Sequence, residues 1–185
     1  MDDKHKNTIS KFLSLVLRHK PETIGLHLDI NGWADIEELI SKSALHRQVF
    51  SKEELREMVL TNDKQRFGFN EDATMIRANQ GHSISIELNL ETKIPPEVLY
   101  HGTVAKFLDS IKAGGLKKMQ RQHVHLSKDR ETAVKVGNRR GDAIVLSVNT
   151  GQMHRDGLSF FLSENGVWLT DNVPAEYIDL NEGTL

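Results

Sequence analysis

Residues 51–77 read SKEELREMVLTNDKQRFGFNEDATMIR, and this stretch decides the fold of the first part of the chain. Ser51 followed three residues later by Glu54 is a capping-box signature, which predicts the start of a short helix. After that helix, the short apolar segments 66–69 and 74–77 flank a turn-rich tetrapeptide. Two such segments around a turn predict a β-hairpin.

Two more helices are predicted upstream of this stretch. Residues 5–19 carry apolar side chains at helical spacing, and Pro21 ends this helix. Asp35 and Glu38 form a second capping-box signature, while residues 26–30 alternate in hydropathy, as in a strand, before an Asn-Gly turn. Helices followed by a small hairpin predict a winged-helix lobe over residues 1–80.

The pattern changes beyond residue 80. Residues 81–96 are assigned to a linker or first strand, because they begin in a polar, glycine-containing stretch and end in a Pro-Pro pair. Residues 97–185 then alternate short apolar segments with two helices that end at glycines. This alternation of short apolar segments and helices predicts an α+β lobe with a mixed or antiparallel sheet. Strands are predicted at 98–100, 124–126, 143–148, 167–169 and 177–180, and helices at 104–113 and 129–136.

The composition is that of an ordinary soluble globular protein, 38% hydrophobic and 27% charged. No apolar run approaches the roughly 18 residues needed to cross a bilayer, and the N-terminus lacks the apolar core of a targeting peptide. The absence of cysteine excludes disulfides, thiolate catalysis and Cys-based zinc sites, and it fits a reducing cytoplasm. A cytoplasmic location is expected from these features, and a monomer from the modest size and the lack of an obvious apolar patch.

The charge is nearly balanced and evenly distributed. The formal net charge is −2, and residues 1–80 and 81–185 each carry 12 Lys and Arg against 13 Asp and Glu. A nucleic-acid ligand would therefore have to be bound by a local cluster of cations, with fewer phosphate contacts than a strongly basic protein makes.

Arg18 and His19 lie at the predicted C-terminal end of the first helix. A basic residue there commonly complements the helix dipole, which stabilises by roughly 0.3–1 kcal/mol. The alternative is a phosphate site, because the planar fork of arginine donates two parallel hydrogen bonds to an oxyanion. Arg66 and Arg121 are candidate partners, since converging arginines repel one another unless an anion lies among them.

His101-Gly102-Thr103 is expected to follow one strand and precede the next helix. One interpretation is a simple strand-to-helix turn with Thr103 as the N-cap. The other is a ligand-facing strand end that offers a histidine and a hydroxyl to a ribose, with glycine allowing close approach. Ser127 has the same two interpretations, as a ligand hydroxyl or as the N-cap of the following helix.

His123 and His125 would face the same side of one strand. Zinc would need a third ligand, for which His101 is conceivable, and no metal is expected. Arg139-Arg140 is either a solvated basic turn or a contact to a pyrophosphate or RNA. Phe160-Phe161, with Trp168, is interpreted as core, with stacking on a ligand ring as the alternative.

Eight segments, taken in order, resemble the tRNA 2′-phosphotransferase family of the KptA type. They extend over nearly the whole chain, and although each is weak alone, the ordered set is highly specific. The segments are KFLSLVLRH (11–19), GWA (32–34), KQRF (64–67), LYHGT (99–103), GL (115–116), MQRQHVHLS (119–127), AVKVG (133–137) and SENGVWL (163–169).

The resemblance implies a winged-helix RNA lobe, an ADP-ribosyltransferase-like lobe that binds NAD⁺, and an active site between them. It implies an Arg-His-Arg-Arg catalytic set, which falls on Arg18, His19, Arg66 and Arg121, with Arg139 as the alternative for the last member. The implied NAD⁺ contacts fall on His101, Gly102, Thr103, Ser127 and Arg139. No Gly-x-Gly-x-x-Gly or Walker-type phosphate loop occurs, so NAD⁺ would be held differently from a Rossmann site.

The reaction implied by the resemblance removes a 2′-phosphate from tRNA-like RNA, as in tRNA splicing. NAD⁺ is consumed through an ADP-ribosylated 2′-phosphate intermediate, and the products are nicotinamide, ADP-ribose 1″,2″-cyclic phosphate and RNA with a free 2′-OH. Two alternatives stay open at this point. One is an ADP-ribosyltransferase acting on nucleic-acid terminal phosphates or protein, and the other is a non-catalytic winged-helix nucleic-acid binder.

Overall fold

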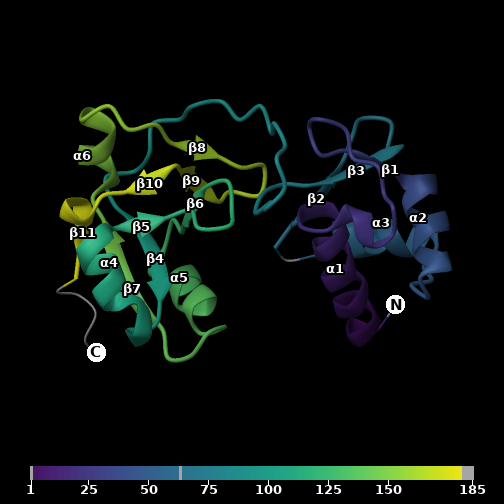
Figure 1. Cartoon of the computed structure of the whole chain (residues 1–185), viewed down its shortest axis with the longest axis horizontal. Helices are drawn as coiled ribbons and strands as arrows, with labels where there is room; N and C mark the ends of the chain where they lie inside the picture. Colours follow the sequence, from purple (N-terminus) through teal and green to yellow (C-terminus); the bar gives the residue numbers. More distant parts are fainter. Residues whose placement is uncertain (1, 63, 181–185) are drawn as a thin grey trace. The chain divides into compact units, whose positions relative to one another are not determined.

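The computed structural model describes residues 2–62 and 64–180, and it divides into two compact units, Met1–Asn89 and Leu90–Leu185 (Figure 1). The boundary between the units falls within residues 81–96. Unit 1 contains α1 (Asp3–Arg18), η1 (Pro21–Thr23), β1 (Ala34–Asp35), α2 (Ile36–Leu45), α3 (Lys52–Leu60), β2 (Phe67–Phe69) and β3 (Met75–Ala78). Unit 2 contains β4 (Leu99–Thr103), η2 (Ala105–Phe107), α4 (Leu108–Gly114), β5 (Leu116–Lys117), β6 (Val124–Leu126), α5 (Arg130–Gly137), β7 (Ile144–Val148), α6 (Thr150–Arg155), β8 (Phe161–Leu162), β9 (Trp168–Thr170), β10 (Asn172–Val173), η3 (Ala175–Tyr177) and β11 (Ile178–Asp179).

In unit 1, the helices α1, α2 and α3 surround a core with an antiparallel sheet of order β1-β3-β2. The predicted hairpin is confirmed, since Phe67 pairs with Ala78 and Phe69 with Ile76. The predicted capping box of α3 is confirmed as well, with the Ser51 side chain accepting from the N–H of Glu54 and the reciprocal bond in place.

The start of α2 differs in one detail from the expected capping box. Asp35 is the N-cap, and its carboxylate accepts the N–H of Glu38 at 2.8 Å. The Glu38 carboxylate, however, accepts from the backbone N–H of His27 and from the Lys42 ammonium. The helix therefore has the expected start, while Glu38 ties α2 to the preceding loop.

The strand suggested by the alternating residues 26–30 is not formed, although the following turn is. The Asp29 carboxylate accepts from the backbone N–H groups of Asn31 and Trp33 at 2.9 and 2.8 Å. Such local side-chain bonds to the backbone compete with a strand ladder. Gly32 closes the turn with a positive φ of 80°, a conformation that glycine adopts without a steric penalty.

The described part of unit 2 forms three antiparallel sheets, of order β11-β7-β4, β6-β9-β8 and β10-β5. All five predicted strand regions and both predicted helices are present, so the mixed α/β character with antiparallel sheets is confirmed. The structure adds α6, β5, β8 and β10. These elements have two to six residues, too few for a hydropathy period to show in the sequence.

His101, Gly102 and Thr103 lie within β4, so the expectation that they form a strand-to-helix turn is wrong. Thr103 is the last strand residue and does not cap a helix, because the N-cap position of η2 is Val104. A Cβ added at Gly102 would lie 1.9 Å from the Ala133 carbonyl oxygen. Close packing of β4 on α5 therefore requires glycine here, whatever ligand approaches.

Ser127 is likewise not the N-cap of α5. That position belongs to Asp129, whose carboxylate accepts the N–H of Thr132 at 2.7 Å. Ser127 instead extends the region of β6, where it exchanges two backbone hydrogen bonds with Tyr100 of β4. The packing at this point joins β6 to the strand that carries His101.

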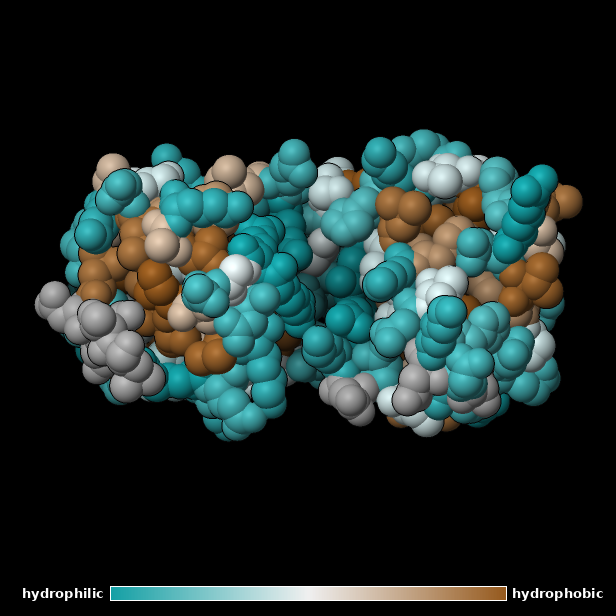
Figure 2. Space-filling model, turned by 90° about the horizontal axis from the view of Figure 1, so that it is seen from below, coloured by the Kyte–Doolittle hydropathy of each residue, from teal (hydrophilic) through white to brown (hydrophobic). Residues whose placement is uncertain are grey.

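Both units expose some large hydrophobic side chains among hydrophilic ones, and Figure 2 shows hydrophobic areas on each. The monomeric state expected from the sequence stays a prediction. None of the helices in the described ranges is at once long enough and apolar enough to cross a membrane.

Candidate active site

Arg18 and Arg66 come together in unit 1 although 48 residues separate them. Arg18 is the last residue of α1, and its Nη2 donates to the Arg66 carbonyl oxygen at 3.3 Å, with the guanidinium 5.5 Å from the centre of the Phe67 ring. Nη1 of Arg66 lies 3.5 Å from Oγ of Ser10 on α1. Arg18 is 9% exposed, so it is packed against β2 instead of extending into solvent as a simple partner of the helix dipole.

The segment Asn79–Ser83 also belongs to this site, which the sequence did not reveal. The backbone N–H of Ser83 donates to the Arg18 carbonyl oxygen at 2.9 Å, and Nδ1 of His19 lies 2.9 Å from Ser83 Oγ. His82, between Gly81 and Ser83, is buried. A polar stretch with a glycine is typical of any loop, so its composition gave no sign of a site.

His82 lies in a strongly positive environment. Burial and, to a smaller extent, the charges of Arg18, His19 and Arg77 lower its pKa to about 3. At neutral pH the ring is therefore uncharged. The unit 1 cluster is defined as Arg18, His19, Arg66 and the adjoining neutral His82. The positive charges of Arg18, His19 and Arg77 around His82 would stabilise an anion bound there.

The same pKa predicts how unit 1 responds to acid. Because the pKa of folded His82 is about 3 against an ordinary value of 6.5, the unfolded chain binds the extra proton between these two pH values. We expect the stability of unit 1 to fall as the pH is lowered through this window, by up to about 1.4 kcal/mol per pH unit. Amide hydrogen exchange of α1 would measure this. His82→Phe should flatten the dependence, and an equally steep dependence in that variant would contradict the assignment.

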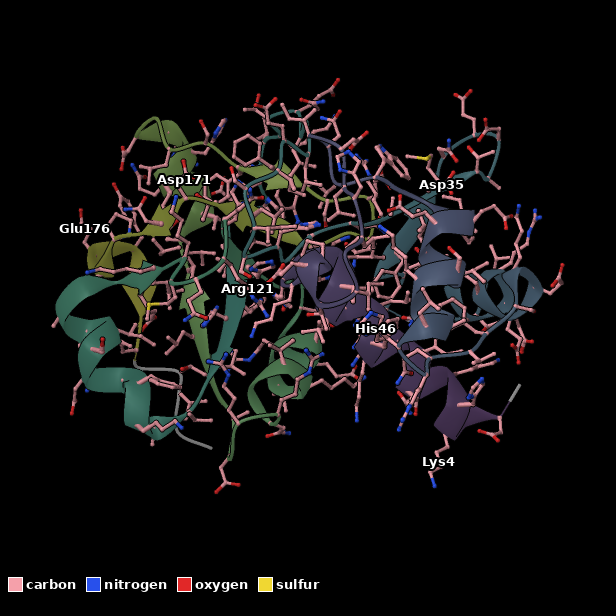
Figure 3. The ribbon with its side chains drawn as sticks, turned by 45° about the vertical axis from the view of Figure 1, so that its right-hand side comes forward. Lys4, Asp35, His46, Arg121, Asp171 and Glu176 are labelled. Atoms are coloured by element: carbon pink, nitrogen blue, oxygen red, sulfur yellow. The ribbon has the colours of Figure 1, made fainter. Side chains whose placement is uncertain are left out.

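A second group of cations lies in unit 2, around Arg121 on the loop between β5 and β6 (Figure 3). Nη1 of Arg121 lies 3.5 Å from Nδ1 of His125. Burial lowers the pKa of Arg121, and the positive charges of Arg140 and Arg139 lower it further. Charges of one sign repel one another, and a bound phosphate or pyrophosphate would relieve the repulsion that lowers the pKa of Arg121.

His101 on β4 completes the unit 2 cluster, which comprises His101, Arg121, His125, Arg139 and Arg140. Burial lowers the pKa of His101, and the charges of Arg140 and Arg121 lower it further, although its hydrogen bond to His125 opposes them. Nδ1 lies 3.1 Å from the His125 carbonyl oxygen, which can only accept, so Nδ1 carries the proton. Nε2 therefore offers a lone pair to a hydroxyl donor such as a ribose.

His123 and His125 have different neighbours among the described residues. His123 packs on Phe161 with ring centres 5.6 Å apart, while His125 contacts Arg121. Throughout residues 2–62 and 64–180, no three His, Cys, Asp or Glu side chains are grouped to hold a metal ion. Phe160 and Trp168 are buried, which confirms their interpretation as core, whereas Phe161 is half-buried and is not part of the core.

The site residues expected from the sequence thus fall into two groups, one in unit 1 and one in unit 2. Contacts in unit 1 join Arg18, His19 and Arg66. The residues expected in unit 2 are His101, Gly102, Thr103, Arg121, Ser127 and Arg139. Of these, Arg139 is exposed and Thr103 is buried.

Comparison with known proteins identifies the family. The family model described as RNA 2′-phosphotransferase, Tpt1 / KptA family, matches residues 4–172. A probable RNA 2′-phosphotransferase of Flavobacterium johnsoniae is 62% identical over 179 residues, covering 97% of this chain and 98% of that protein. Proteins of the same description from Acaryochloris marina and Burkholderia pseudomallei are each 53% identical, over 95% and 91% of this chain and 97% and 92% of theirs. The chain belongs to the RNA 2′-phosphotransferase, Tpt1 / KptA family.

Proposed function

We propose that this member of the RNA 2′-phosphotransferase family transfers the 2′-phosphate of an RNA to the ADP-ribose part of NAD⁺. Family membership supports removal of a 2′-phosphate from RNA by a transferase. The residue assignment is carried by the contact between Arg18, at the end of α1 beside His19, and the main chain of Arg66, 48 residues away in the sequence. A phosphate dianion is the ligand that the unit 1 cluster favours.

In this proposal unit 1 is a winged-helix RNA lobe and unit 2 is an ADP-ribosyltransferase-like lobe that binds NAD⁺. The helices followed by the β2–β3 hairpin support the first assignment. The short antiparallel sheets of unit 2 and its cation cluster support the second. Arg121 and Arg139 suit a pyrophosphate, while the Nε2 lone pair of His101 suits a ribose hydroxyl, with Ser127 on the neighbouring strand.

The first step forms a bond between an oxygen of the RNA 2′-phosphate and C1″ of the nicotinamide ribose. Nicotinamide leaves as a neutral molecule, so the step needs no general acid. The phosphate is already an anion, and it needs no glutamate to activate it as a nucleophile. In this step the unit 1 cluster binds and orients the phosphate.

In the second step the ribose 2″-OH attacks phosphorus and the RNA 2′-oxygen leaves, taking up a proton as it becomes a hydroxyl. The products are repaired RNA and ADP-ribose 1″,2″-cyclic phosphate. Negative charge gathers on the phosphoryl oxygens, where fixed guanidiniums stabilise the transition state. We assign this role to Arg18, Arg66 and Arg121, while His19 orients the phosphate or transfers a proton.

Incubation of the protein with NAD⁺ and an RNA carrying one internal 2′-phosphate tests the proposal. Mass analysis should find nicotinamide, ADP-ribose 1″,2″-cyclic phosphate and an RNA that has lost its phosphate. The matched control is the same RNA with a free 2′-OH, which should leave NAD⁺ intact. Accumulation of ADP-ribosylated RNA as the final product would favour the simple ADP-ribosyltransferase. Calorimetric titration with NAD⁺ that gives no heat of binding would favour the non-catalytic binder.

A further inference from the structure

We infer that Ser83 is a positioning residue for His19, and that the segment Asn79–Ser83 holds the unit 1 cluster in its working geometry. This inference rests on the proposed function of His19 and Arg66. It assigns a role to a stretch whose sequence resembles an ordinary polar loop.

Hydrogen bonds connect the segment to the unit 1 cluster at both of its ends. At the first end, the backbone N–H of Asn79 donates to the Arg66 carbonyl oxygen at 2.9 Å, and its side-chain amide donates to the Gln65 carbonyl oxygen at 2.7 Å. At the other end, the N–H of Ser83 donates to the Arg18 carbonyl oxygen at 2.9 Å. One short segment therefore fixes the main chain at both arginines.

Ser83 contacts the side chain of His19, which in the proposed function orients the phosphate or transfers a proton. His19 follows the last residue of α1 as its C-cap, with a non-helical φ of −128° and ψ of −49°. Ser83 Oγ lies 2.9 Å from Nδ1 of that ring, across 64 residues of sequence. The hydroxyl contact at Nδ1 fixes the orientation of the ring and bears on which ring nitrogen carries the proton.

His82 holds the middle of the segment in place. Gly81 has a φ of 87°, and the turn there directs His82 into the interior while Ser83 remains exposed. Among the described residues, neither ring nitrogen of His82 has a hydrogen-bond partner, and burial keeps the ring neutral. His82 thus packs beside Arg18 and His19 without adding a further positive charge to theirs.

The test compares Ser83→Ala with Ser83→Thr in the full chain. We expect Ser83→Ala to lower kcat about 3- to 10-fold, the effect of losing one hydrogen bond, while Ser83→Thr keeps the hydroxyl and restores the rate. In a His19→Ala background the same replacement should change nothing further, since the two residues act as one unit. Ser41→Ala is the matched control, because it removes an exposed serine hydroxyl that bonds within α2.

A spectroscopic measurement on the free protein separates positioning from a general structural effect. The ¹⁵N chemical shifts of the His19 ring report which nitrogen carries the proton, and Ser83→Ala should change them while Ser41→Ala should not. Unchanged His19 shifts and an unchanged kcat in Ser83→Ala would overturn the inference. Failure of the wild-type protein to consume NAD⁺ would instead overturn the proposed function, and the His19 spectrum would still decide whether Ser83 sets the ring.

Discussion

Replacement of Arg66 by alanine should stop the reaction after its first step, so that RNA with an ADP-ribosylated 2′-phosphate accumulates. The first step uses a phosphate that is already a nucleophile, whereas the second concentrates charge on the phosphoryl oxygens. Loss of one preorganised donor to such a charge typically lowers the rate about 10²- to 10³-fold. Single-turnover reactions with RNA labelled next to the 2′-phosphate, separated by mass, would show the intermediate directly.

The structure indicates that Arg66→Ala is a suitable variant for this experiment. Arg18 bonds to the carbonyl oxygen of Arg66, which alanine retains, so that main-chain contact can persist when the guanidinium is lost. Arg66→Lys keeps the charge without the planar fork and should fall between the wild type and Arg66→Ala. Arg56→Ala, at an exposed position on α3, is the matched control and should react normally. Wild-type product yield from Arg66→Ala would refute the assignment.

Arg121→Ala and Arg139→Ala should have different effects on kcat and on the KM for NAD⁺. The difference identifies which arginine is the last member of the catalytic set. Both arginines have exposed side chains, but the Arg121 guanidinium contacts His125 and desolvation lowers its pKa, so we expect its loss to lower kcat about 10²- to 10³-fold. Arg139 is exposed, where one charge contributes up to about 1 kcal/mol, and its loss should mainly raise the KM for NAD⁺ by about fivefold or less.

Steady-state rates at varied NAD⁺, with calorimetric binding of NAD⁺ to each variant, separate the two effects. Arg155→Ala serves as the control in unit 2, since it removes an exposed arginine that pairs with Glu97 away from the unit 2 cluster residues. The reverse pattern, with a large loss of kcat in Arg139→Ala and a small one in Arg121→Ala, would transfer the catalytic role to Arg139.

The local structure of the chain could be predicted from the sequence because local interactions create it. The capping box of Ser51 and Glu54 involves residues three apart, and the hairpin of β2 and β3 joins neighbouring segments. The strand at Val124–Leu126 has the predicted bounds. Prediction failed at residues 26–30, where the Asp29 carboxylate binds the backbone and prevents a strand ladder. The pattern of apolar residues along the sequence does not indicate where such side-chain hydrogen bonds to the backbone will form.

The sequence by itself predicted the capped helices and the β2–β3 hairpin, and the ordered segments indicated the family. Only the tertiary structure decided that Ser83 meets His19, that Asn79 meets Arg66, and that Gly102 is required by the backbone of α5. These contacts join residues 13 to 64 positions apart or depend on how a strand lies against a helix. Hydropathy period and turn chemistry describe neighbours along the chain, whereas such contacts arise only when packing brings distant segments within hydrogen-bond distance.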